Sequence, residues 1–140
     1  MVLFSEINGT KVLLLSALGR PGQNALFTRH PDLRADIVVA GLPQHSDPIA
    51  EAVLDALQPR LIIIADSEYP ASARANRTLR ERLAHRNSRV VYTSESGAVT
   101  ILFHRTDWEV KARNPGANTL NLAMSKLDEL PERPHSAPEE

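Results

Sequence analysis

Hydrophobic and polar positions along the chain form short apolar runs separated by amphipathic stretches, a pattern typical of an α/β protein. The runs at 2–7 and 10–16 flank Asn8-Gly9, the dipeptide that best fits a two-residue type I′ turn, and they predict an N-terminal β-hairpin. Unbroken apolar runs at 35–40 and 59–66 predict strands that are buried on both faces.

Three amphipathic stretches predict helices between and after these strands. The first covers 21–30, with Pro21 near its start. The second follows Ser46-Asp47-Pro48, and its core-facing stripe consists of Ile49, Val53, Leu54 and Leu57. The third covers 71–87, with Ala75, Leu79 and Leu83 at four-residue steps and Asn87 as its stop.

The C-terminal third predicts antiparallel strands and a last helix. Its elements are, in order, a strand at 89–94, a turn at Glu95-Ser96-Gly97, a strand at 98–105, a further strand at 108–112 and a helix at 118–130. Residues 131–140 are rich in proline and charge, and they predict a disordered tail after a module that covers 1–130.

Alternation of strands and helices between residues 36 and 93 implies right-handed parallel crossovers. With the antiparallel segments on either side, the chain predicts an α/β fold with a mixed β-sheet and flanking helices. Apolar side chains from 12–18 and 60–66 should then form a face that a second copy or the last helix covers. Unless the last helix covers this face, the chain is therefore expected to form a homodimer, with a second copy as its partner.

Composition narrows the function classes. The chain has 140 residues, enough for one domain with a real core. A net charge of -1 gives no global signal for nucleic acid or an anionic membrane. The absence of cysteine excludes disulfides and thiolate metal sites. The longest apolar runs are far shorter than the roughly 20 residues that cross a bilayer, so the chain is expected to be soluble.

Most catalytic motifs are missing from the sequence. The segment "LGRPGQ" lacks both the Gly-Lys-Ser/Thr of a phosphate loop and the three-glycine dinucleotide fingerprint, and no Gly-x-Ser-x-Gly elbow occurs. No two of the five histidines are two, three or four residues apart, the spacings that favour metal sites. A capping or surface role for His45 is therefore favoured over a ligand role, and Asp47 is expected to start a helix.

The order of segments carries one specific resemblance. Strand "KVLLLSALG", "RADIVVAGLPQHS", "LQPRLIIIAD" and the hairpin "TSESGAV", with helices between them, resemble the C-terminal half of the metallo-β-lactamase-like domain of the competence protein ComEC family. The likeness covers about residues 9 to 103 and includes Tyr69-Pro70 in the loop before a helix. It implies half of an αββα sandwich, and a parent protein in the bacterial inner membrane with this domain outside the bilayer.

The departures from this family lie where its chemistry would be. Ser16-Ala17 stand where the family has Gly-Asp, and either Pro43 to Ser46 or Gln44 to Asp47 occupy its His-His-Gly-Ser positions. The main His-x-His-x-Asp-His cluster is absent. The resemblance therefore implies no catalytic residue, no metal and no cofactor, with vestigial positions at Ala17, Gln44, His45, Ser46 and Asp47.

The resemblance leaves several functions open. The first is a non-catalytic accessory domain of a DNA-uptake protein, whose partners are its membrane-spanning remainder and, weakly, DNA. The second is a half-site of a metal-dependent hydrolase or nuclease, completed by a missing N-terminal region and using zinc or manganese. The third is a repurposed interaction module. Weak phosphate contacts would come from Arg74, Arg77, Arg80 and Arg82, although a solvated helix face is the favoured explanation of these arginines.

Overall fold

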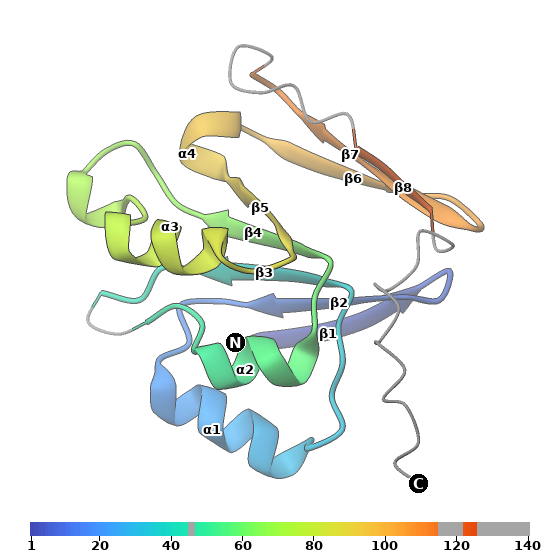
Figure 1. The fold of residues 1–140 in the computed structure, drawn as a ribbon, viewed down its shortest axis with the longest axis horizontal. Helices are drawn as coiled ribbons and strands as arrows, with labels where there is room; N and C mark the ends of the chain where they lie inside the picture. Colours follow the sequence, from blue (N-terminus) through green and yellow to red (C-terminus); the bar gives the residue numbers. More distant parts are fainter. Residues whose placement is uncertain (45–46, 115–121, 126–140) are drawn as a thin grey trace, which may run out of the picture.

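The protein has three layers: helices, a five-stranded mixed sheet and a three-stranded sheet (Figure 1). The computed structural model describes residues 1–44, 47–114 and 122–125. The strands are β1 (Val2–Ile7), β2 (Thr10–Leu15), β3 (Ile37–Gly41), β4 (Leu61–Ala65), β5 (Arg89–Tyr92), β6 (Val99–Phe103), β7 (Asp107–Ala112) and β8 (Leu122–Ser125). The helices are α1 (Arg20–Arg29), α2 (Glu51–Leu57), the 3-10 turn η1 (Ala71–Ala73), α3 (Arg77–Ala84) and α4 (Thr93–Ser96). The predicted α/β class with a mixed sheet and flanking helices is confirmed.

The five-stranded sheet has the order β1-β2-β3-β4-β5. Strands β1 and β2 form the predicted antiparallel hairpin, and Asn8 (φ 50°) and Gly9 (φ 77°) supply the two positive φ angles of its turn. Strands β2, β3, β4 and β5 run parallel, joined by crossovers that contain α1, α2 and α3. The carboxyl ends of four strands therefore meet at one edge.

The central strands are buried on both faces, as their unbroken apolar runs predict. In β4, Ile62 and Ile64 pack under the helices, while Leu61 and Ile63 face the second sheet. All four are at most 4% exposed. Helices contribute to the first cluster mainly through Leu26 and Phe27 of α1, Val53, Leu54 and Leu57 of α2, and Leu79 and Leu83 of α3.

The second sheet covers the opposite face, which corrects two expectations. Strand β5 pairs in parallel with β4, and β6 leaves for a separate antiparallel sheet of order β6-β7-β8 instead of forming a hairpin with β5. The segment expected to be a turn is the short helix α4, which ends at Gly97 with φ 68°. The face of β4 that was expected to need a cover is thus covered by Trp108 and Val110 of β7.

The expected helix at 118–130 is wrong over its described part. Residues 122–125 form β8, which pairs antiparallel with β7. The hydrogen-bonding edge of β7 offers backbone partners that a short helical pattern cannot outcompete. The remainder of this segment and the predicted tail at 131–140 lie outside the described residues. In the part of the chain that the structure describes, no helix has the length and apolar character to span a bilayer.

Two predicted helix starts are also corrected. The stretch at 71–87 is the 3-10 turn η1 followed by α3, and the two are separated because Asn76 is extended and accepts a hydrogen bond from Leu79 N at 2.9 Å. Helix α2 begins at Glu51 with Ala50 as its N-cap, and no side chain caps it. Asp47 is therefore not a capping residue.

Candidate functional site at the carboxyl edge of the sheet

The carboxyl ends of β2, β3, β4 and β5 gather the positions that the sequence marked for chemistry. Open α/β sheets bind ligands at this edge. The chain leaves β2 through Ser16-Ala17, β3 through 42–44, β4 through Asp66 and β5 through Thr93-Ser94. The structure thus brings Ala17, Gln44 and Asp47 to one edge of the molecule.

Ala17 and the end of β3 lie directly against each other. A Cβ atom at Gly41 would lie 3.3 Å from Ala17 N and 3.8 Å from its Cα, so only glycine fits without displacement of this backbone. The methyl group of Ala17 cannot ligate a metal, and Gln44 is exposed. His45 and Ser46 lie outside the described residues.

Asp66 is the ionisable side chain that is most completely enclosed at this edge, with a side-chain exposure of 0%. Its Oδ2 accepts hydrogen bonds from Ala75 N and from Ser94 Oγ, both at 2.9 Å, and its Oδ1 accepts one from Ser94 N at 2.8 Å. Both oxygens are therefore occupied by protein donors. The carboxylate joins the end of β4 to the residues before α3 and to the end of β5.

Arg80 provides the positive charge for this carboxylate. Its Nη2 lies 3.7 Å from Asp66 Oδ2, its Nη1 donates to Glu95, and its guanidinium lies 4.0 Å from the ring centre of Tyr92. Burial raises the pKa of the Tyr92 phenol above its ordinary value of 10.0, and the Arg80 charge works in the opposite direction. The arginine is thus a structural cation held by three side chains.

Asp47 belongs to a different set of contacts on the β3–α2 connection. Its carboxylate lies 3.4 Å from Arg20 Nη2, with both side chains more than half exposed. The buried Gln23 side chain donates to the backbone oxygens of Leu18, Asp47 and Pro48, and its Oε1 accepts from Ala50 N at 2.9 Å. Gln23 therefore fixes this connection to α1, and Asp47 forms only a surface ion pair.

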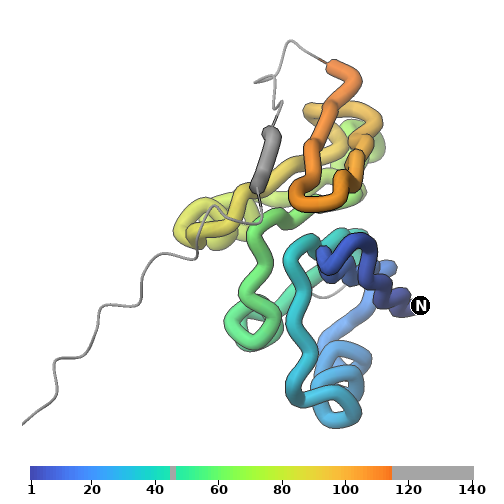
Figure 2. The backbone as a smooth tube through the Cα atoms, turned by 90° about the vertical axis from the view of Figure 1, so that its right-hand side faces the viewer, coloured from blue at the N-terminus to red at the C-terminus, as the bar shows by residue number. Residues whose placement is uncertain are grey.

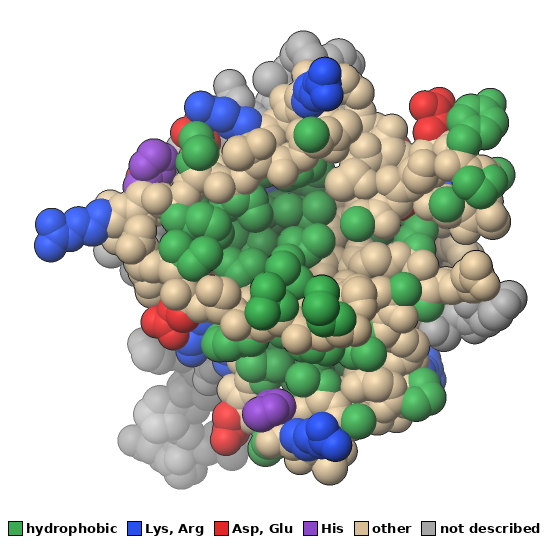
Figure 3. All heavy atoms as spheres, turned by 180° about the vertical axis from the view of Figure 1, so that it is seen from behind, with side chains coloured by type: hydrophobic (Ala, Val, Ile, Leu, Met, Phe, Trp, Pro, Cys, Tyr) green, Lys and Arg blue, Asp and Glu red, His purple; other side chains and the backbone are tan. Residues whose placement is uncertain are grey.

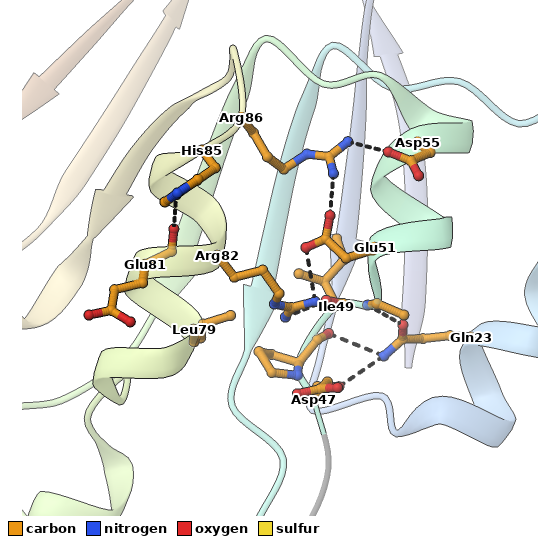
Figure 4. A network of polar contacts seen from close by, with 12 residues as sticks. Gln23, Asp47, Ile49, Glu51, Asp55, Leu79, Glu81, Arg82, His85 and Arg86 are labelled. Atoms are coloured by element: carbon orange, nitrogen blue, oxygen red, sulfur yellow. Dashed lines mark hydrogen bonds and ion pairs between the residues drawn. The ribbon is translucent and has the colours of Figure 1, made fainter.

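A second network links α2 to α3 (Figure 4). Arg82 donates to Ile49 O at 2.8 Å and lies 3.2 Å from Glu51. Arg86 contacts Glu51 at 2.5 Å and Asp55 at 2.7 Å. Both arginine side chains are less than a quarter exposed. These charges hold two helices together over the core.

A pocket of about 500 Å³ lies between the β3–α2 connection and the segment that contains α3. The residues at 42–44 and Asp47 form one side, and the segment from Ser72 to Arg82 forms the other. Its polar side chains are Gln44, Asp47, Ser72, Arg74, Asn76, Thr78 and Arg82. The structure therefore places four of the vestigial and candidate positions around one pocket: Gln44, Asp47, Arg74 and Arg82.

The four arginines proposed for phosphate contact do not form one free basic surface. Arg77 pairs with Glu81 at 2.6 Å, and Arg80 and Arg82 are engaged as described above. Arg74 is exposed and makes no ion pair within the described part of the chain. Arg74 and Arg77, whose side chain is 90% exposed, are the two members that reach solvent most freely.

No group of three or more His, Asp or Glu side chains within 1–44, 47–114 and 122–125 is placed to hold a metal ion. Sequence reasoning did not single out Asp66, Gln23 or the structural role of Arg80. Asp66 had one available signal, its place directly after a buried parallel strand. Gln23 had none, because a glutamine in a helical stretch is usually exposed.

Comparison of the chain with protein-family models, with curated proteins and with solved structures gave no match.

Proposed function

We propose that this chain is a non-catalytic, metallo-β-lactamase-like accessory domain of a ComEC-type DNA-uptake protein. The observation that carries the proposal is the chemistry of the carboxyl edge. Ala17 lies against Gly41, and neither has a side chain able to bind a metal, while the enclosed carboxylate of Asp66 accepts from three hydrogen-bond donors and lies beside Arg80. A hydrolytic zinc needs three protein ligands and an open position for water.

The arrangement of the first sheet also supports this reading. A hairpin followed by three parallel strands with helices on one face follows the order of the segments up to β5 on which the resemblance rests, whereas the segment "TSESGAV" forms α4 and the start of β6 and no hairpin. The domain would lie outside the bilayer in a parent protein of the bacterial inner membrane. Its role would be to position other parts of that protein, because its own edge carries too few ligands for catalysis.

Measurement of the metal content tests whether the chain can hold the ion that hydrolytic catalysis would require. The full chain, dialysed against zinc or manganese and then against metal-free buffer, is expected to retain far less than one ion per chain. Its melting temperature should be the same with added metal and with chelator. Retention of about one ion per chain, with a melting temperature that chelator lowers, would contradict the proposal.

The alternative is a half-site of an active metal-dependent hydrolase or nuclease, completed by another region or chain. The pocket beside Gln44 and Asp47 favours it, because a concave polar surface at the carboxyl edge is where such a site would lie. The same metal experiment separates the two functions. Deletion of this domain in the organism that encodes it tests DNA uptake, where a loss of transformation by naked DNA is expected.

A further inference from the structure

Exposed hydrophobic side chains concentrate on the first hairpin. Six large hydrophobic residues are exposed in the described part of the chain, and five belong to residues 1–15: Met1, Leu3, Phe4, Ile7 and Leu14. The view from behind shows a broad gathering of hydrophobic side chains (Figure 3), on the side where the tube view places the N-terminal strand (Figure 2). Such a concentration is typical of an interaction surface.

Strand β1 also lies at one end of the five-stranded sheet, with β2 as its neighbour. Ser16 N donates to Met1 O at 3.2 Å, which fixes the alternation of hydrogen bonds along the hairpin. Residues 1, 3, 5 and 7 therefore direct their backbone groups toward β2, and Val2, Phe4 and Glu6 direct theirs outward. An edge of this kind accepts another β-strand.

We propose that a second copy of this chain docks on this edge by antiparallel pairing of the two β1 strands. The proposal is independent of the function proposed above. The strand lacks most of the features that usually block edge pairing: it contains no lysine, no proline and no bulge, all six of its residues pair in register with β2, and Glu6 is its one charge. Its flanking side chains are apolar, as an interface between copies requires.

Charge selects the register of the two strands. Glu6 is the one charged residue of β1, so a register that opposes Glu6 to Glu6 of the partner is unfavourable. A two-fold axis beside Phe4 pairs Phe4 with Phe4, Val2 with Glu6, and Met1 with Ile7 of the second copy. This register uses the whole strand and places the two carboxylates about 14 Å apart along the strands. It also forms an aromatic cross-strand pair.

Sedimentation of the full chain tests the pairing. The chain without substitutions is expected to be dimeric at about 100 µM, as for a micromolar dissociation constant. Phe4→Lys and Phe4→Glu should each be monomeric, because each places two like charges opposite one another. An equimolar mixture of the two variants should form a dimer again. Tyr69→Lys is the matched control, since Tyr69 is exposed but lies outside the hairpin, and it should remain dimeric.

Folding of the variants is checked by far-ultraviolet circular dichroism, and Phe4 is 44% exposed, so the fold should tolerate both changes. Glu6→Pro is a second route: it removes an outward N–H that serves only the pairing between copies, and it should also give a monomer. If the chain without substitutions is monomeric, the proposal is overturned, and the edge of β1 would then be available to a strand of a different protein. A dimer that survives Phe4→Lys and Glu6→Pro, or variants that fail to associate when mixed, would overturn it as well.

Discussion

At the scale of single residues, Asp66 joins the most distant parts of the sequence at the carboxyl edge. Its contacts reach Ala75, Arg80 and Ser94, which belong to the segments before α3, within α3 and after β5. A buried carboxylate is stable only when donors and a counter-charge replace its lost hydration. Both are present here, so Asp66 stabilises the fold and has no oxygen left free of protein donors.

Asp66→Ala should lower the free energy of unfolding by about 3 kcal/mol, because it removes three hydrogen bonds and leaves Arg80 without its buried partner. Urea unfolding followed by circular dichroism measures the change. Asp55→Ala is the control, since Asp55 pairs with Arg86 while its side chain is 69% exposed. Its loss should cost less than about 1 kcal/mol. Equal effects of the two changes would refute a special role for Asp66.

The sequence supported only part of this residue-level picture. The inability of Ala17 to bind a metal follows from its identity alone, whereas the saturation of Asp66 depends on Ala75 and Ser94, which are 9 and 28 residues away in sequence. The role of Gln23 is likewise a product of tertiary structure, because its partners lie in the connection before α2. Such contacts leave no periodic signal in the sequence.

At the scale of elements, local signals predicted most strands and failed where tertiary pairing decides. The turn at Asn8-Gly9 and the apolar runs of β3 and β4 gave correct strands, because each requirement lies within a few residues. The expected hairpin at 89–105 is wrong, since the apolar side chains of β6 pack, partly buried, against the opposite face of the first sheet. Pairing between distant strands cannot be read from alternation alone.

Helix α3 offers a test of the boundary that sequence reasoning missed. Asn76 caps the helix through Leu79 N, so Asn76→Ala should lower the free energy of unfolding by about 1 kcal/mol. Asn76→Asp should keep the cap and restore most of that stability. Asn87→Ala, at an exposed position beyond the helix, is the control and should change little. Urea unfolding midpoints measure all three variants, and an Asn87→Ala loss as large as that of Asn76→Ala would argue against the cap.

At the scale of the whole molecule, three layers account for where function can reside. The helices cover one face of the first sheet and the second sheet covers much of the other, and among the described residues the carboxyl edge and the outer side of the first hairpin remain accessible. The carboxyl edge carries a polar pocket, and the hairpin carries apolar side chains. A positioning domain would use the hairpin to bind protein and the edge for any weak contact with DNA.

Ion pairs engage most arginines of the segment 71–87, so we expect any contact of this segment with DNA to be weak. Arg80 cannot serve as a free phosphate ligand, and reversing its charge would damage the fold, because it contacts Asp66, Glu95 and Tyr92. Arg74 and Arg77 remain as the accessible pair. With a net charge of -1 on the chain, we expect no measurable affinity for single-stranded DNA at physiological salt.

At low salt, two phosphate contacts should give weak binding with a log-log salt slope of about -1.4, from roughly -0.7 per contact. Fluorescence anisotropy with a labelled oligonucleotide measures it. Arg74→Glu combined with Arg77→Glu should abolish this binding, while Arg29→Glu with Arg34→Glu, the same charge change at exposed positions elsewhere, should leave most of it. If the Arg74 and Arg77 reversal has no effect, this segment does not contact DNA. Tight binding of single-stranded DNA at physiological salt would contradict this expectation, because it would require more free arginines than Arg74 and Arg77.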